Sequence, residues 1–232
     1  MSFYEVLGLN KEPFSSSPDP GFFYSLKEHR FVLNRLEIAI RQKRGLMVVI
    51  GDIGLGKTTI TRKLLQNFNN EDDYIFFPIL NPSFSSEFQF LENLVKMFKI
   101  NHIRRSTIEY RLAVQDFLFK MGVKEHKTVV LIIDEGQKLS QDILEILRVF
   151  LNYETNEYKL LQLVIMAQIE LLPKIEKMQN FADRICFKHI LRPITLNEAK
   201  ELVYFRLREA GLEDGRLLFS EEAIKKIYNA CL

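Results

Sequence analysis

One stretch of the sequence has the residue types and the spacing of a phosphate-binding loop. It fits the pattern G-x-x-x-x-G-K-[ST], follows an apolar run and opens a helical segment. Glycines let successive backbone N–H groups wrap a polyphosphate, and the helix that follows points its positive end at the anion. Lys57 is expected to reach the β- and γ-phosphates, and the Thr58 hydroxyl to ligate Mg²⁺. The predicted residues for ATP or ADP are Gly51, Asp52, Ile53, Gly54, Leu55, Gly56, Lys57, Thr58 and Thr59.

A second candidate group is the pair of carboxylates that ends the apolar run Val129–Ile133. A carboxylate at the C-terminal end of a strand near a phosphate loop can hold Mg²⁺ directly or through water, and this metal role is expected of Asp134. Glu135 is the candidate general base that polarises an attacking water. The alternative for Glu135 is an ordinary acid at the entry of a helix.

Two polar residues near later strands are further catalytic candidates. Gln168 follows the run Leu161–Ala167, where it can hold the attacking water or sense the γ-phosphate; the alternative is a simple strand cap. Arg184 precedes the last predicted strand and can act as an arginine finger on the nucleotide of a neighbouring subunit. Arg192 is its competitor, and a surface salt bridge is the alternative for each.

These residues need a parallel sheet to bring them to one edge. Short apolar runs alternate with amphipathic helices, the pattern of a sheet that is covered on both faces. The prediction is an α/β P-loop fold with a five-stranded parallel sheet between helices. The expected strands are Leu46–Ile50, Tyr74–Leu80, Thr128–Ile133, Leu161–Ala167 and Ile185–Leu191, and the expected helices run from about Lys27 to Arg44, over 59–68, and through 84–98 and 110–118.

Three regions are expected along the chain. Residues 1–26 are rich in Pro, Ser and aromatic residues and predict an extended arm that packs on the core. Residues 27–193 form the nucleotide-binding core. Residues 194–232 predict a small helical lid, because Thr195 and Glu198 make a capping box and Ala210-Gly211 a helix stop. The lid is expected to be incomplete, since its second helix lacks a partner for its apolar face.

Composition narrows the possible partners. The 232 residues carry 32 Lys and Arg against 30 Asp and Glu, a net charge of +2 that predicts no global attraction to nucleic acid or anionic lipid. Two distant cysteines and four scattered histidines predict neither a disulfide nor a metal cluster. The cysteine usage favours a reducing, cytoplasmic setting. No apolar run approaches the roughly 20 residues of a membrane helix, so no membrane-spanning segment is expected. A local basic cluster is expected to be a solvated loop, with phosphate contact as the alternative: Lys96, Lys99, His102, Arg104 and Arg105.

With these residues in hand, the chain resembles the AAA+ ATPases of the ExeA type, the ATPase component of bacterial general secretion pathway protein A and its pilus-biogenesis relatives. The resemblance covers nearly the whole chain. Its most specific part is the opening arm, including Glu12-Pro13-Phe14 and Pro18-Asp19-Pro20; it also rests on 51–58, 131–140, 168–171, 184–193 and 206–211. It implies Lys57 and Thr58 on nucleotide and Mg²⁺, Asp134 and Glu135 as metal and water partners, Gln168 as sensor 1, and Arg184 as the finger.

The resemblance also implies a function and two departures. The implied function is Mg²⁺-dependent ATP hydrolysis by a ring-forming homo-oligomer that drives assembly of a secretion or pilus apparatus. The implied location is the cytoplasm, with the cytoplasmic domain of an inner-membrane protein as the variant. Transposition ATPases of the TniB and MuB type share the core, so an ATP-dependent DNA-binding adaptor is the alternative. Family members usually continue to a sensor 2 arginine and, in secretion members, to a membrane helix, and this sequence ends before both.

Overall fold

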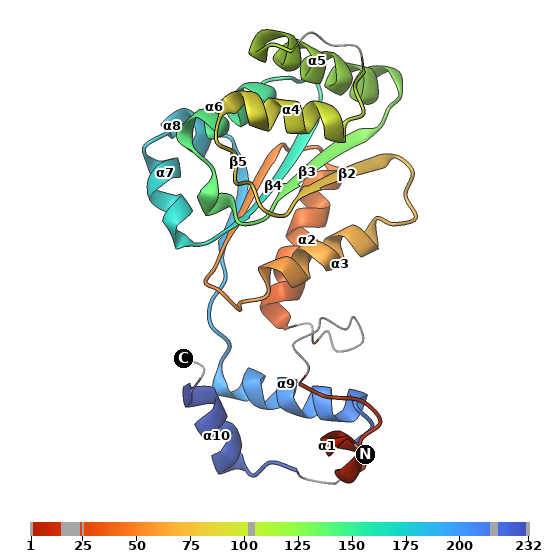
Figure 1. Ribbon diagram of the computed structural model, residues 1–232, viewed down its shortest axis with the longest axis vertical. Coiled ribbons are helices and arrows are strands. Elements are labelled where there is room, and N and C mark those ends of the chain that lie inside the picture. Colours follow the sequence, from red (N-terminus) through yellow and green to blue (C-terminus); the bar gives the residue numbers. More distant parts are fainter. Residues whose placement is uncertain (1, 15–23, 25, 102–104, 214–217, 231–232) are drawn as a thin grey trace. The chain divides into compact units, whose positions relative to one another are not determined.

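The computed structural model describes residues 2–14, 24, 26–101, 105–213 and 218–230 (Figure 1). Serine residues begin three of the helices: the hydroxyls of Ser86, Ser106 and Ser140 each accept a hydrogen bond from the backbone N–H three residues on. The helices are α1 (Phe3–Val6), α2 (Lys27–Arg41), α3 (Lys57–Asn67), α4 (Glu87–Met97), α5 (Thr107–Phe119), α6 (Gln141–Phe150), α7 (Leu172–Glu176), α8 (Gln179–Ala182), α9 (Leu196–Glu209) and α10 (Glu221–Ala230), and the strands are β1 (Leu46–Ile50), β2 (Tyr74–Ile79), β3 (Thr128–Ile133), β4 (Leu161–Ala167) and β5 (Ile185–Ile190).

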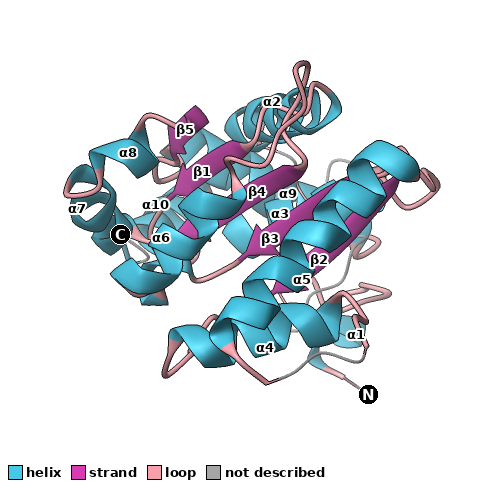
Figure 2. Cartoon of the chain, turned by 90° about the horizontal axis from the view of Figure 1, so that it is seen from above, coloured by secondary structure: helices cyan, strands magenta, loops and turns pink. Residues whose placement is uncertain are grey.

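The five strands form one sheet in the order β2-β3-β4-β1-β5, and every neighbouring pair is parallel (Figure 2). Strands β1, β3 and β4 are buried along their whole length, as expected of the apolar runs that form them. Strand β4 lies between β1 and β3. This order places the end of β4 between the residues that follow β1 and those that follow β3.

Helices cover both faces of the sheet (Figure 1). Residues of β1 alternate between two apolar clusters. Val48 belongs to the cluster that includes residues of α4, α5, α6 and α8, whereas Val49 belongs to the cluster that includes residues of α2 and α3. Strands β3 and β4 alternate in the same way. The predicted α/β fold with a covered five-stranded parallel sheet is therefore confirmed.

Several element boundaries differ from the prediction by a few residues. Strands β2 and β5 each end one residue earlier than expected, at Ile79 and Ile190. Helix α2 ends at Arg41, three residues before the expected end at Arg44, because the chain turns there through positive φ angles at Lys43 and Gly45. Helix α3 begins at Lys57, two residues earlier than expected.

The chain divides into two compact units. One is Phe31–Leu191, which contains the sheet, and the other combines Met1–Arg30 with Arg192–Leu232. Within the second of these units, described residues of the predicted arm contact α9 and the residue that follows it. Leu9 joins a small apolar cluster with Leu207 and Ala210, and the backbone N–H of Asn10 donates to the carbonyl of Ala210 at 2.7 Å. In the part of the chain that the structure describes, no helix has the length and apolar character needed to cross a membrane.

Candidate functional site

The loop between β1 and α3 has the backbone that its glycines predict. Gly54 and Gly56 both have φ of 83°, a left-handed conformation that residues with a Cβ rarely adopt. Gly56 is also the residue directly before α3, so the helix begins at Lys57 with its free N–H groups facing the loop. The Gly51 N–H donates to the carbonyl of Ala167 in β4 at 3.0 Å, which ties the loop to the sheet.

The side chain of Lys57 is held inside the curve of this loop. The residue is only 6% exposed, and its Nζ donates to the carbonyl oxygens of Gly51 at 2.7 Å and Asp52 at 2.8 Å. Ile53 is 81% exposed, so this residue can contribute its backbone but not a packed side chain. The ammonium group and the start of α3 together make a concentrated positive site for an anion.

Thr58 and Asp134 meet across the sheet edge. The Thr58 hydroxyl donates to Asp134 Oδ2 at 2.8 Å, and Asp134 Oδ1 accepts the backbone N–H of Glu135 at 2.9 Å. Asp134 is 4% exposed, so its carboxylate has a fixed orientation. A hydroxyl and a carboxylate oxygen side by side fit Mg²⁺, which takes one or two protein ligands and completes its shell with phosphate and water. Among the described residues no group of three His, Cys, Asp or Glu side chains could hold a metal by itself.

Glu135 stands in an unusual backbone conformation. Its φ of 57° and ψ of 36° lie in the left-handed region, which non-glycine residues rarely occupy and which is found at functional sites. Its carboxylate accepts a 2.8 Å hydrogen bond from Gln137 Nε2 and lies 3.9 Å from Lys138 Nζ. Glu135 precedes only a single 3₁₀ turn, Gly136–Lys138, and its side chain does not cap that turn. The Glu135 carboxylate is therefore held by Gln137 directly after Asp134.

Gln168 emerges between the two halves of the site. It follows β4, which lies between β1 and β3, so it leaves the sheet between the phosphate loop and Asp134. Its backbone N–H donates to Gln137 Oε1 at 3.1 Å. Its side chain makes no capping bond to the turn that follows, Ile169–Leu171.

Three residues near the site were missed by the sequence interpretation. Gln137 bridges Glu135 and Gln168, and Lys174 of α7 donates to the carbonyl oxygens of Gln137 at 2.6 Å and Leu139 at 2.8 Å. Gly136 packs so closely on β4 that a Cβ there would lie 2.3 Å from Ile165 Cγ2. The spacing of Gln137 from Glu135 is a usable signal, whereas nothing in the sequence around Lys174 indicates its contact.

The two candidate finger arginines lie in different units. Arg184 directly precedes β5, and Ile185 pairs with Leu46 at the start of β1. Because β1 and β5 are parallel, Arg184 lies at the sheet edge opposite the phosphate loop, about 15 Å of strand away, and cannot reach the loop of its own chain. Its Nε is buried without a hydrogen-bond partner. Arg192 belongs to the other unit, where its backbone N–H donates to Glu28 Oε2 at 3.3 Å.

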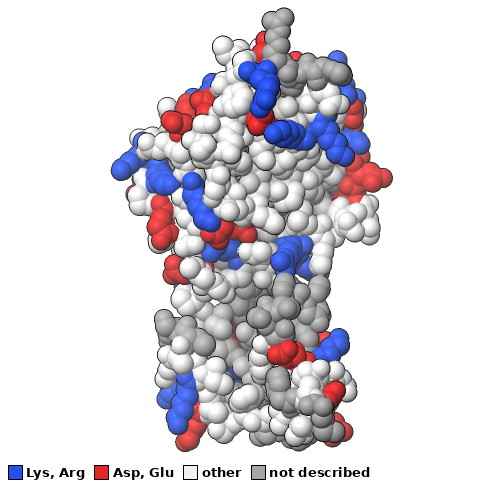
Figure 3. Space-filling view, viewed as in Figure 1, with Lys and Arg blue, Asp and Glu red and all other residues white. Residues whose placement is uncertain are grey.

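The described part of the basic cluster is partly neutralised. The Glu92 carboxylate forms ion pairs with Lys96 at 3.1 Å and with Arg105 at 2.7 Å. These contacts lower the pKa of the Glu92 carboxyl. Lys99 is exposed, and residues 102–104 lie outside the described residues, so the expectations for His102 and Arg104 have no structural counterpart. On the face seen in Figure 3, basic and acidic side chains are interspersed over the unit that holds the sheet.

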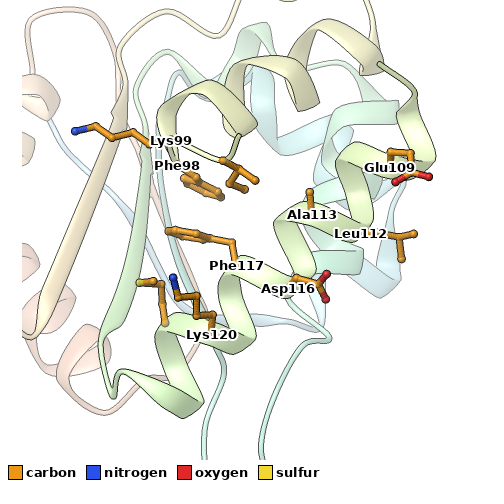
Figure 4. Close-up of a pocket in the computed structure, with 10 residues that line it drawn as sticks. Phe98, Lys99, Glu109, Leu112, Ala113, Asp116, Phe117 and Lys120 are labelled. Carbon is orange, nitrogen blue, oxygen red and sulfur yellow. The ribbon is translucent and has the colours of Figure 1, made fainter. Parts of the chain in front are cut away.

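A hollow of about 880 Å³ lies at the end of α4 and along α5 (Figure 4). The rings of Phe98 and Phe117 stack there with centroids 4.5 Å apart, and the charged groups around them are of both signs, including Asp116 and Lys120. None of its lining residues belongs to the phosphate loop or follows β3 or β4. The hollow is therefore separate from the candidate site.

Comparisons with known proteins agree with this geometry. A family model described as an AAA domain matches residues 40–175. General secretion pathway protein A of Aeromonas hydrophila is 31% identical over 229 residues, which are 97% of this chain and 41% of that protein. The chain thus spans about two fifths of the length of this relative.

Solved structures share the fold at low sequence identity. Cdc6p of Pyrobaculum aerophilum matches with a TM-score of 0.68 and 20% identity, over 92% of this chain and 58% of that one. The Aeropyrum pernix ORC2 protein, in ADPNP-ADP complexes, matches with a TM-score of 0.64 and 16% identity, over 94% and 59%. Drosophila ORC bound to DNA matches with a TM-score of 0.61 and 17% identity, over 95% and 58%.

Proposed function

Because the chain belongs to the AAA domain family, we propose that it binds ATP with Mg²⁺ through residues 51–59 and Asp134, and hydrolyses it. The observation that carries the proposal is the 2.8 Å hydrogen bond between Thr58 and Asp134. It joins the start of α3 to the end of β3 at the point where a phosphate-bound Mg²⁺ needs both oxygens. Bound Mg²⁺ would neutralise charge on the β- and γ-phosphates.

The residues of the chain divide the remaining work. Lys57 stabilises negative charge on the phosphates. Glu135 accepts a hydrogen bond from the attacking water and orients it. Gln168 lies between them and contacts the same water or the γ-phosphate. Arg184 is proposed to act in trans on the site of a neighbouring copy, since it cannot reach its own loop. The working form would then be a homo-oligomer, a ring in which each site is completed between subunits.

The proposed role is to drive assembly of a bacterial secretion or pilus apparatus. The support is the 31% identity with a general secretion pathway protein A over nearly the whole of this chain. The activity would take place in the cytoplasm or on the cytoplasmic side of the inner membrane, where ATP is available.

The test is ATP turnover per subunit over a wide range of protein concentrations, with sizing of the same samples in ATP and Mg²⁺. Lys57→Ala serves as the blank and Glu135→Gln as the variant that retains nucleotide but lacks the base. We expect turnover per subunit to rise together with assembly, and Glu135→Gln to bind ATP without hydrolysing it. Turnover in Glu135→Gln equal to wild type would remove Glu135 from the base role, and absence of ATP binding would overturn the whole proposal.

The alternative is an ATP-loaded DNA adaptor of the transposition type, with duplex contact near Lys99. Pairing of Lys96 and Arg105 with Glu92 leaves less positive charge there than the sequence predicts, which favours the assembly role. Duplex retention that requires ATP and weakens steeply with salt would support the adaptor. No retention at low salt would eliminate it.

A further inference from the structure

Gln137 lies between two residues of the proposed catalytic site and bonds to both. Its Oε1 accepts the backbone N–H of Gln168 at 3.1 Å, and its Nε2 donates to Glu135 Oε2 at 2.8 Å. From this bridge we infer that Gln137 is a positioning residue, which holds the Glu135 carboxylate for hydrolysis and couples it to the end of β4. The inference rests on the proposed function, because it assumes that Glu135 orients the attacking water.

The orientation of the amide follows from the chemistry of its neighbours. A backbone N–H can only donate, so the oxygen of the Gln137 side chain must face Gln168. The nitrogen is then directed to the Glu135 carboxylate, which can only accept when ionised. Both ends of the amide are matched, and rotation by 180° would oppose two donors at one end and two acceptors at the other.

The backbone around the amide is fixed on both sides. Glu135 is in the left-handed region, and Gly136 lies so close to β4 that a larger residue there would force the loop or the strand to shift. On the other side, Lys174 Nζ holds the carbonyl oxygens of Gln137 and Leu139. The contact of Gly136 with β4 and the two hydrogen bonds from Lys174 therefore fix the backbone position of Gln137.

Two consequences follow for Glu135. Its Oε2 is bonded to Gln137, which leaves Oε1 to meet water and removes rotational freedom from the carboxylate. A shift of the Gln168 backbone would also move the amide and, through it, the carboxylate. Contact of Gln168 with the γ-phosphate is thereby transmitted to the group that orients the water.

The test uses two replacements of nearly equal size. Gln137→Leu removes both hydrogen bonds, and Gln137→Glu keeps the bond to Gln168 but opposes a carboxylate to Glu135. We expect kcat for ATP to fall by about 10- to 100-fold in both, because the reacting group loses its fixed geometry. The Kd and KM for ATP are expected to stay within about twofold, since Lys57, Thr58 and Asp134 are untouched. Gln141→Leu, an exposed amide four residues away, is the matched control and should retain wild-type kcat.

The outcomes separate the inference from the function on which it rests. If both variants keep or exceed wild-type kcat while Glu135→Gln abolishes turnover, the positioning role is overturned and the proposed function stands. If Glu135→Gln turns over at the wild-type rate, Glu135 loses the base role and the inference about Gln137 is overturned with it. Absence of ATP binding by the wild type would overturn the proposed function itself. If both variants lower the melting temperature and weaken ATP binding together with kcat, Gln137 has a purely structural role, and this result would also overturn the inference.

Discussion

The hydroxyl of Thr58 lies 2.8 Å from Asp134 Oδ2, although 76 positions separate the two residues in the chain. Thr58 is in the first turn of α3, and Asp134 follows β3, which is not the neighbour of β1 in the sheet. The intervening strand β4 therefore sets the width of the site. This one contact joins the phosphate loop to the acidic pair and makes the proposed metal position depend on both.

Removal of the Thr58 hydroxyl should weaken Mg²⁺ binding more than nucleotide binding. In Thr58→Ala we expect the Mg²⁺ concentration for half-maximal turnover to rise by about 10- to 100-fold, because a ligand of the metal is lost. Titration of Mg²⁺ at saturating ATP measures the effect, and Thr58→Ser, which keeps the hydroxyl, is the control. An unchanged Mg²⁺ requirement in Thr58→Ala would remove Thr58 from the metal site.

Gly136→Ala should destabilise the unit that holds the sheet. The added Cβ would lie 2.3 Å from Ile165 Cγ2 and 3.3 Å from the Met166 carbonyl oxygen, so the loop or β4 must shift. Overpacking of this kind costs about 1–3 kcal/mol, which denaturant unfolding can measure.

The same substitution in an Ile165→Ala background provides the control for this prediction. There the clashing methyl is absent, so Gly136→Ala should cost clearly less than in the wild type. An identical cost in both backgrounds would show that contact with Ile165 is not the cause.

Arg184→Ala should abolish turnover without loss of ATP binding if the arginine acts between subunits. Fingers of this type contribute about 10³- to 10⁵-fold to the rate. Mixing Arg184→Ala with Lys57→Ala subunits should restore part of the activity, because the first supplies an intact phosphate loop and the second an intact arginine. Turnover of the mixture gives the measurement.

Arg192→Ala, treated in the same way, distinguishes the two candidates. Complementation by Arg192→Ala and none by Arg184→Ala would transfer the finger role to Arg192. Turnover that survives Arg184→Ala undiminished would exclude Arg184 altogether.

The capping box of α9 should make this helix sensitive to acid. The backbone N–H of Thr195 donates to Glu198 at 2.8 Å and lowers the pKa of the Glu198 carboxyl below its usual value near 4.5. A carboxyl with a lowered pKa in the folded state stabilises above its unfolded pKa, and the stabilisation is lost as the pH falls through the folded value. Glu198→Gln keeps a capping side chain but loses its charge, so it should destabilise α9 by about 0.3–1 kcal/mol at neutral pH and by less in acid.

Amide hydrogen exchange in α9, compared with wild type at each pH, measures this difference. Glu209→Gln, at the opposite end of the same helix, is the control and should cause no comparable loss. A Glu198→Gln effect that stays constant down to acid pH would contradict a charge-dependent cap.

The phosphate loop and the strands of the sheet could be predicted from the sequence, because their signals are local. The glycine spacing in 51–58 implies a tight loop, and the apolar runs imply buried parallel strands, since both depend on residues that are close in sequence. The five strands and the AAA-type family were confirmed. The role of Glu135 and the finger role of Arg184 remain predictions for the experiments above.

The contacts that tertiary structure decided lie between elements distant in sequence. The apolar residues within residues 1–26 indicate an anchor but not its partner, and only the folded chain pairs Leu9 with Leu207. In the same way, the sequence supplies Gln137 and Lys174 without relating them. The strand order β3-β4-β1 brings Gln168 to the amide of Gln137. The sequence could not show this contact, because strand order is set by packing over the whole sheet and not by any local preference.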